Sequence, residues 1–403
     1  MRWYHTRVTT LRHAHPRTGP ERSLETYRGL FPILESTTFL NSNSMGAMPS
    51  TAEAGLAEYA NLWATEGGEA WEVWLPLIDE VAALAGRFFG AGPGEVILNQ
   101  NVSFFQNMIA GSLEFTPQRN KVVMSALEFP SLLYVWDRAR KLGADLHIIP
   151  SDDGISVPTE RLLDAIDERT VIVPISHAYF VSAALTDVPA IIHRAHQVGA
   201  YVLVDIYQTA GVLPIDVKAW DVDMAVGGSH KWLCGGPGCA WLYVRPDLRA
   251  ELAPMATGWF AHAEPFAFEP PPIRYAERAW RFMGGTPSIP AYYVAREAYK
   301  ILLEIGVERI RRHNLTLTQR LVSRAQEAGL SIHSPLDPDA RTGFVAIDFP
   351  GAEQATRTLI AERFKLDWRP NCGIRIGPHF YTTPDEIDRF VDRAAELMRA
   401  KQH

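Results

Sequence analysis

Short apolar runs alternate with helical patterns through the first half of the chain, and this alternation is the strongest constraint on the fold. Runs rich in valine, isoleucine and leucine occupy residues 95–98, 121–127, 145–149, 171–175 and 201–204. Patterns with apolar residues every three or four positions separate them, at residues 104–113, 131–142, 159–166 and 188–198. Strands joined by helical crossovers pair in parallel. We therefore predict an α/β fold whose large domain holds a mainly parallel, helix-covered sheet.

The flanking segments indicate a second, smaller domain. Two amphipathic helices are predicted before the first strand, at residues 51–65 and 75–89, and a proline- and aromatic-rich connection occupies residues 250–290. A long helical pattern, bent near Gly306, follows it, and then come strand and helix patterns at residues 344–349, 352–364, 373–376 and 383–400. We predict an N-terminal arm (1–30), a large domain (31–290) and a small C-terminal α+β domain (291–403), with residues 31–50 packing on the small domain.

Composition narrows the class of protein. Of 403 residues, 47% are hydrophobic and 21% charged, which predicts a packed globular protein. The net charge of −7 argues against a nucleic-acid partner, which would require a basic surface. Three cysteines cannot form a disulfide framework and show no zinc spacing, so we expect a reducing cytoplasm and no metal. No apolar run is long enough for a membrane span. The arginines of the first twenty residues fit a solvated arm or, alternatively, an organellar transit peptide.

Residues 201–244 carry the clearest chemical signal. Asp205 ends one apolar run, where an unpaired carboxylate is expensive to bury, and Lys231 follows the next run. A pyridoxal phosphate site requires such a pair, because the carboxylate keeps the pyridine nitrogen protonated and the amine binds the aldehyde as a Schiff base. Gly227 and Gly228 would allow a close backbone approach to the cofactor. The alternatives are an acid that caps the next helix and a lysine at a solvated strand end.

Seven motifs, in order along the chain, resemble those of fold-type I pyridoxal phosphate enzymes of the class V aminotransferase group, most closely kynureninases. They are FLNSNSMGAMP (39–49), EFPSLLY (128–134), VDIYQTAG (204–211), SHKWLCGGPG (229–238), GWFAH (258–262), GGTPSIP (284–290) and GIRIGPHFYTT (373–383). The resemblance extends from about Phe31 to about Leu397. It implies a pyridoxal 5′-phosphate enzyme that acts on an α-amino acid through an external aldimine.

The resemblance also implies roles for individual residues. Phe129 would stack on the cofactor ring, Asp205 would pair with its nitrogen, and Lys231 would form the Schiff base. Further cofactor or phosphate contacts are implied at Asn101, Val102, Ser131, Gln208, His230 and Trp259, and substrate contacts at Asn43 and Arg375. Arg375 would clamp the substrate α-carboxylate through two parallel hydrogen bonds. Thr286 would reach the phosphate of a neighbouring subunit, which implies a homodimer with shared active sites.

Several of these residues also have a purely structural interpretation. Phe129 and Trp259 could serve in packing, His230 could be a structural histidine, and Arg375 could form a surface ion pair. We interpret Cys372 as a small apolar residue that fills space in the packing. A cysteine desulfurase would need a cysteine on a mobile loop well before Arg375, and the sequence has none there.

The chain departs from kynureninases at three positions. They usually have aspartate at the position of Leu132, histidine at that of Gln208, and tyrosine at that of His230. The fold and cofactor expectations are unaffected, whereas the substrate stays open. We favour cleavage beyond Cα, by Cβ–Cγ hydrolysis or β-elimination. The alternatives are an aminotransferase, an amino-acid epimerase, and a non-catalytic sensor that binds pyridoxal phosphate.

Overall fold

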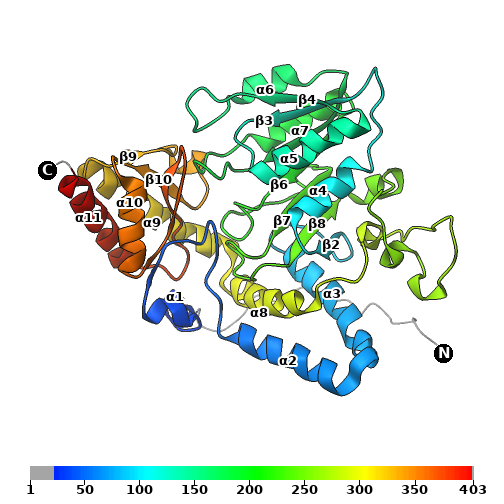
Figure 1. Cartoon of the computed structure of the whole chain (residues 1–403), viewed down its shortest axis with the longest axis horizontal. Helices are drawn as coiled ribbons and strands as arrows, with labels where there is room; N and C mark the ends of the chain where they lie inside the picture. The colour runs from blue at the N-terminus through cyan, green and yellow to red at the C-terminus, as the bar shows by residue number, and fades with distance from the viewer. Residues whose placement is uncertain (1–21, 402–403) are drawn as a thin grey trace.

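A seven-stranded sheet forms the centre of the larger part of the molecule in the computed structural model, which describes residues 22–401 (Figure 1). Its spatial order is β2-β8-β7-β6-β5-β3-β4. The strands are β2 (Val96–Asn99), β3 (Lys121–Ser125), β4 (Asp145–Ile149), β5 (Thr170–Ser176), β6 (Tyr201–Asp205), β7 (Met224–Gly228) and β8 (Ala240–Val244). Only β8 runs against the other six, because both of its pairings are antiparallel. The carboxyl ends of those six strands therefore share one edge.

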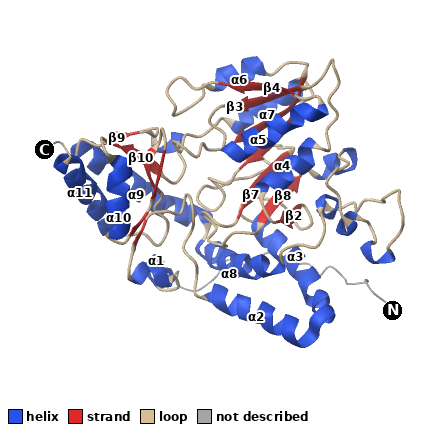
Figure 2. Ribbon diagram, viewed as in Figure 1, coloured by secondary structure: helices blue, strands red, loops and turns tan. Residues whose placement is uncertain are grey.

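Helices cover this sheet along its whole width (Figure 2). One group packs against the β2 and β8 end: α3 (Trp71–Gly86) and α4 (Val102–Ala110). A second group packs against the other strands: α6 (Thr159–Ala165) and α7 (Val188–Gln197). α5 (Pro130–Arg138) packs on α4. Every residue of β3, β5, β7 and β8 is buried, as expected for strands covered on both faces.

A smaller four-stranded sheet, in the order β12-β13-β10-β9, has its own hydrophobic core. Its strands are β9 (Ser331–Ile332), β10 (Val345–Asp348), β12 (Asp367–Arg369) and β13 (Gly373–Ile376). The helices that contribute to this core are α9 (Val307–Glu327), α10 (Ala352–Ala361) and α11 (Pro384–Ala400). The N-terminal strand β1 (Thr38–Phe39) pairs in parallel with β11 (Phe364–Lys365). This pair forms a separate two-stranded sheet that ties an early segment of the chain to the C-terminal part.

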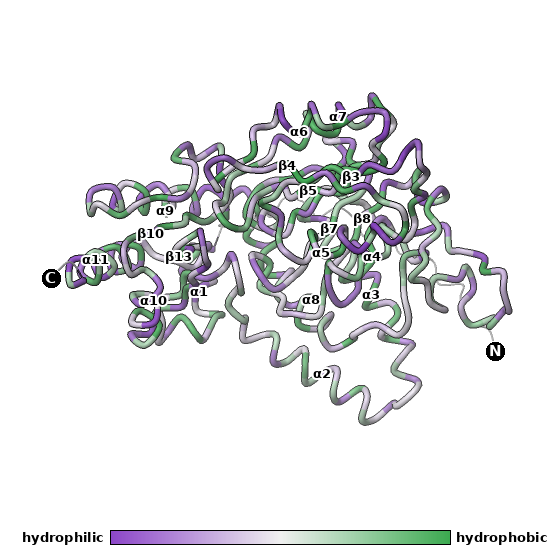
Figure 3. Tube along the Cα trace, turned by 45° about the horizontal axis from the view of Figure 1, so that its top comes forward, coloured by the Kyte–Doolittle hydropathy of each residue, from purple (hydrophilic) through white to green (hydrophobic). Residues whose placement is uncertain are grey.

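Two helices connect the N-terminal segment and the two sheets. α2 (Thr51–Glu66) packs against α8 (Ile289–Ile305), and α8 also packs against α3. Hydrophobic and hydrophilic residues alternate along α2 (Figure 3), and only Ala52 and Gly55, near its N-terminal end, are buried. α8 ends at Gly306, whose φ of +88° breaks the helix before α9 begins.

The predicted fold class is confirmed, and the structure refines its details. Each of the five apolar runs forms a strand, but the ends differ by up to two residues because hydrogen bonding, not composition, ends a strand. The prediction of direct parallel pairing is wrong for β2, whose neighbour is the antiparallel β8. The predicted bend near Gly306 is confirmed.

The domain limits stay predictions. α8 begins beside the proposed boundary near residue 290, yet its buried side chains belong to the larger core. Residues 1–21 of the proposed arm lie outside the described residues, and the rest of the arm includes α1 (Leu24–Arg28). Among residues 22–401 no helix is both long and apolar enough to cross a membrane.

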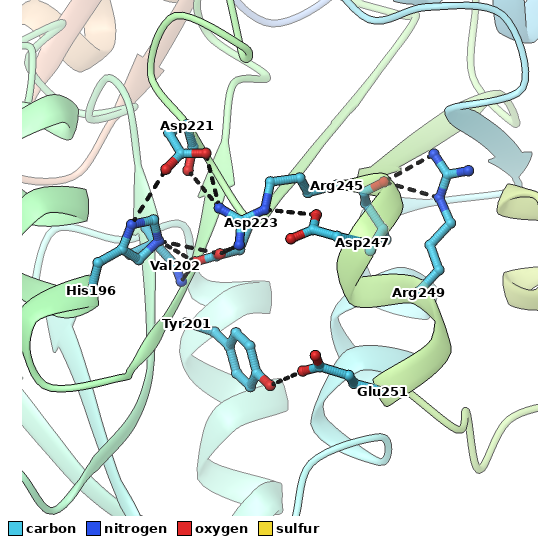
Figure 4. A network of polar contacts seen from close by, with 10 residues as sticks. His196, Tyr201, Val202, Asp221, Asp223, Arg245, Asp247, Arg249 and Glu251 are labelled. Carbon is cyan, nitrogen blue, oxygen red and sulfur yellow. Dashed lines mark hydrogen bonds and ion pairs between the residues drawn. The ribbon is translucent and has the colours of Figure 1, made fainter.

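A buried carboxylate joins the beginnings of two central strands (Figure 4). Asp223 is only 1% exposed and accepts a hydrogen bond of 2.8 Å from the backbone N–H of Val202. It also contacts His196 at 3.1 Å and Arg245 at 3.4 Å. Burial raises the pKa of this carboxyl, and these partners act against that shift. The network lies where β6 and β7 begin, at the opposite end from the shared carboxyl edge.

We expect Asp223→Ala to lower the free energy of unfolding by about 2–4 kcal/mol, because it leaves the buried N–H of Val202 without its acceptor and removes one of the carboxylates that pair with Arg245. Asp247→Ala is the matched control, since Asp247 pairs with the same Arg245 but its side chain is 65% exposed. We expect the control to stay within about 0.5 kcal/mol of the parent protein. Urea denaturation followed by circular dichroism measures both. Equal effects of the two substitutions would contradict the assigned role of Asp223.

Candidate active site

A cavity of about 220 Å³ opens at the carboxyl edge of the central sheet. Segments that follow β2, β3, β5, β6 and β7 supply its lining, so residues far apart in sequence meet there. Eight predicted cofactor-site residues line it: Asn101, Val102, Phe129, Ser131, Asp205, Gln208, His230 and Lys231. Ser103, Leu132, Ser176, Ala178, Phe180 and Tyr207 complete the lining. This is the place where open α/β sheets bind their ligands.

Asp205 ends β6 and is 6% exposed. Its carboxylate accepts one backbone hydrogen bond of 2.8 Å, from the N–H of Tyr207. Burial raises its pKa to about 6, opposed by that hydrogen bond and by the charge of Lys231. A buried carboxylate with so few partners can accept a further hydrogen bond from a positively charged ring nitrogen.

Lys231 lies just beyond β7, in the turn that leads to β8. Within the described part of the chain its amine makes no hydrogen bond or ion pair, and it lies 4.5 Å from the ring centroid of Tyr207. Burial lowers its pKa to about 8, opposed mainly by the charge of Asp205. A large share of the amine is therefore neutral near pH 8 and can act as a nucleophile or a base.

The first turn of α4 faces the cavity. Asn101 is its N-cap, and the side-chain oxygen accepts a 2.8 Å hydrogen bond from the N–H of Phe104. Val102 and Ser103, at the start of the helix, line the cavity with it. Helix N-termini carry free N–H groups and a partial positive charge, so they bind phosphate. Ser131 adds a hydroxyl from the start of α5.

Gln208 and Asn43 are joined by a hydrogen bond of 3.0 Å from Gln208 Nε2 to the backbone oxygen of Asn43. Gln208 Oε1 also accepts a bond of 3.2 Å from Trp232, so packing already holds the amide that was predicted to contact the cofactor. Asn43 is fully buried, and neither polar atom of its side chain has a partner among the described residues. Asn43 does not line the cavity, so its predicted contact with the substrate stays a prediction.

Arg375 does not line the cavity and is not free. Its guanidinium forms a two-pronged ion pair with Asp367, with Nε at 3.0 Å from one carboxylate oxygen and Nη2 bonded to the other. Its Nη1 donates to the backbone oxygen of Phe180 at 2.9 Å, and Phe180 does line the cavity. Arg375 is buried on β13, so a surface ion pair is excluded.

Trp259 and Thr286 also lie outside the cavity. Trp259 is 37% exposed and packs on Phe260, Phe266 and Phe268 in the aromatic connection. Thr286 is exposed. Both therefore stay predictions.

The pattern of strand ends did not single out two residues that shape the site. Glu128 is 2% exposed beside the cavity, and one of its oxygens accepts a hydrogen bond from Ser176 while the other has no partner among the described residues. Burial raises its pKa to about 8. Tyr207 lies in the cavity wall, and its hydroxyl contacts His230. Both residues follow strands, and only the folded packing distinguishes them from their neighbours.

The arrangement suits a phosphorylated pyridine cofactor. Asp205 offers a partner for a ring nitrogen, the first turn of α4 offers donors for a phosphate, and Lys231 offers an amine whose pKa burial lowers to about 8. Together these groups can hold an aldehyde cofactor and move a proton beside it.

Comparison with known proteins agrees with this geometry. The family model for aminotransferase class-V matches residues 75–390. An uncharacterized aminotransferase, YcbU of Bacillus subtilis (strain 168), is 33% identical over 92% of this chain and 97% of its own length. A kynureninase of Bacillus thuringiensis subsp. konkukian is 25% identical over 94% of this chain and 92% of its own length.

Solved structures share the fold. An apo cysteine desulfurase from Thermococcus onnurineus NA1 superposes with a TM-score of 0.85 at 21% identity, covering 94% of this chain and 99% of that one. C-DES, with lysine 223 replaced by alanine and glycine covalently linked to its pyridoxal phosphate cofactor, gives 0.84 at 21% identity over 92% and 99%.

The raised pKa of Glu128 predicts how the stability of the protein depends on pH. Its carboxyl titrates near 4.5 in the unfolded chain and near 8 in the folded one, so folding takes up a proton between these values. Its contribution to stability is therefore present below pH 4.5 and lost as the pH rises through about 8. We expect Glu128→Gln to flatten the fall in stability of the ligand-free protein between pH 5 and about 8, as measured by urea denaturation.

The exposed Glu160 provides the control, since Glu160→Gln should leave the pH dependence as it is. An unchanged pH dependence in Glu128→Gln would show that this carboxyl ionises normally.

Proposed function

The chain belongs to the class V aminotransferase family, and from this premise we propose that it is a pyridoxal 5′-phosphate enzyme that cleaves an α-amino acid beyond Cα. The observation that carries the proposal is the unpaired amine of Lys231, whose pKa burial lowers to about 8, in one cavity with the carboxylate of Asp205, which accepts a single backbone hydrogen bond. The cofactor, when bound, supplies an aldehyde for the amine and a ring that accepts electrons.

Three elements of the chain hold the cofactor in this proposal. Asp205 accepts a hydrogen bond from the ring nitrogen and keeps it protonated. The N–H groups at the start of α4, with Ser131, bind the phosphate. Lys231 would hold the aldehyde of the cofactor, and its amine would take or return a proton at Cα of the substrate.

Arg375 is proposed to bind the substrate α-carboxylate, with Asp367 fixing the plane of its guanidinium. Asp367 and Phe180 occupy only part of the donor set of an arginine, so N–H groups remain for a carboxylate. Asn43, whose amide has no partner among residues 22–401, is proposed to contact the same substrate.

The preference for cleavage beyond Cα rests on the likeness to kynureninases along 94% of the chain. Transamination is the second candidate, because the relative at 33% identity is called an aminotransferase. Desulfuration through a persulfide is not supported, since Cys234, Cys239 and Cys372 are all buried and burial raises the pKa of each thiol. A thiolate nucleophile requires the opposite shift.

Assembly and location complete the proposal. Thr286 is exposed in the single chain, as a residue that serves a neighbouring subunit would be, and we propose a homodimer with shared sites. The three unpaired cysteines support a cytoplasmic location.

We expect the purified protein to show the absorbance band of lysine-bound pyridoxal phosphate and, after borohydride reduction, to carry the cofactor on Lys231. Peptide mass spectrometry locates the modified residue. In Lys231→Ala no lysine should be modified, whereas Lys218→Ala, which removes a lysine that is 53% exposed, should label as the parent does. Labelling of a different lysine would contradict the assigned site.

A panel of amino acids tests the reaction. We expect kynurenine or a related substrate with a leaving group on the side chain to release that group and leave a three-carbon product, detected by mass spectrometry. Arg375→Lys should lower kcat/KM about tenfold or more, because an ammonium cannot make two parallel hydrogen bonds to a carboxylate. A keto acid formed together with the pyridoxamine form of the cofactor would instead establish transamination.

A further inference from the structure

Two aromatic rings flank the amine of Lys231. The Nζ atom lies 4.5 Å from the ring centroid of Tyr207 and 5.7 Å from that of Phe129, over a face of each. Both distances are within the roughly 6 Å at which a cation is attracted to an aromatic face. Phe129 precedes α5 and Tyr207 follows β6, so the two rings reach the amine from different elements. Phe129, Tyr207 and Lys231 all line the same cavity.

Close packing holds the Tyr207 ring in this position. A Cβ atom on Gly228 would lie 2.2 Å from the phenol oxygen, so the end of β7 has room for this ring only because residue 228 is glycine. On the other side, the backbone N–H of Tyr207 donates to Asp205. Tyr207 is thus fixed by the residue proposed to bind the cofactor nitrogen and by the strand that leads to Lys231.

The hydroxyl of Tyr207 lies 2.7 Å from Nδ1 of His230. Burial raises the pKa of this phenol, so it keeps its proton and donates. Burial also lowers the pKa of His230 to about 4, with a smaller effect from the charge of Lys231, so the imidazole is neutral at pH 7. A neutral imidazole that accepts at Nδ1 carries its proton on Nε2. Within residues 22–401 that N–H has no protein acceptor, and His230 lines the cavity.

We propose that Tyr207 is a further cofactor-binding residue, whose ring covers the face of the cofactor ring opposite Phe129 and whose hydroxyl holds His230 in the tautomer that donates from Nε2. The proposal rests on the assignment of this cavity to pyridoxal phosphate. It explains why a bulky phenol occupies the wall of a cavity of about 220 Å³: a planar ring attached to Lys231 would lie between two aromatic faces.

Two substitutions separate the ring from the hydroxyl. Tyr207→Leu keeps an apolar side chain but removes the aromatic face, and we expect it to weaken the binding of pyridoxal phosphate to the apoprotein about tenfold or more. Tyr207→Phe keeps the face and should weaken binding about three- to tenfold, because His230 is no longer held. Tyr201→Phe is the matched control: its phenol, at the far end of β6, bonds only Glu251, and affinity should not change. Quenching of protein fluorescence measures the dissociation constants.

A second measurement needs no cofactor. Nitrogen NMR of histidine-labelled apoprotein distinguishes the two tautomers, and His230→Gln identifies the signals of His230 among the 13 histidines. We expect the Nε2–H tautomer in the parent protein and a mixture in Tyr207→Phe. Parent-like affinity in Tyr207→Leu would overturn the stacking role, and an Nδ1–H tautomer in the parent would overturn the role of the hydroxyl. If the parent apoprotein binds no pyridoxal phosphate, the proposed function fails, whereas the tautomer result still reports on Tyr207 and His230.

Discussion

The buried carboxylate of Asp205 is the constraint on which the site depends. It lies at the end of a central strand with one backbone hydrogen bond, and burial raises its pKa to about 6. The nearest opposite charge that acts on it is Lys231, whose own amine is driven toward its neutral form by the same burial. Neither group fully compensates the cost of burying the other's charge. A ligand with a positive ring nitrogen and an electrophilic carbon relieves both costs, so the apolar environment makes the site selective for such a ligand.

The sheet makes this placement possible. Six strands point the same way, so Asn101, Phe129, Asp205 and Lys231 meet at one edge although they are spread over 131 positions of the sequence. The smaller sheet supplies Arg375, whose guanidinium bonds the backbone of the cavity-lining Phe180. Arg375, which is proposed to bind the substrate, is thus linked to the cavity by a contact between the two parts of the chain. A shift of the smaller part would move Arg375 relative to Lys231.

Part of this site was readable from the sequence because some requirements are local. Asp205 and Lys231 each follow an apolar run, and an ionisable residue at the end of a buried strand is conspicuous without a structure. Asn101 was predicted through the family resemblance, and only the structure shows that it caps α4. Arg375 was found through its motif, but its ion pair with Asp367 was not, because antiparallel strand register places those two side chains together. Tyr207 was passed over, since nothing in the sequence places its hydroxyl against His230.

The sequence by itself predicted the strand and helix alternation, the family, and Asp205 and Lys231 as the anchors of the cofactor, because these predictions follow from periodicity and from short motifs. Only the tertiary structure shows that β8 runs antiparallel to its neighbours and that Asp367 forms an ion pair with Arg375. It also shows that the rings of Tyr207 and Phe129 both lie close to the amine of Lys231. The physical reason is the same in each case. Contacts between side chains on different elements depend on strand register and on packing around small residues such as Gly228. Neither the register nor the packing can be derived from the spacing of residues in the sequence.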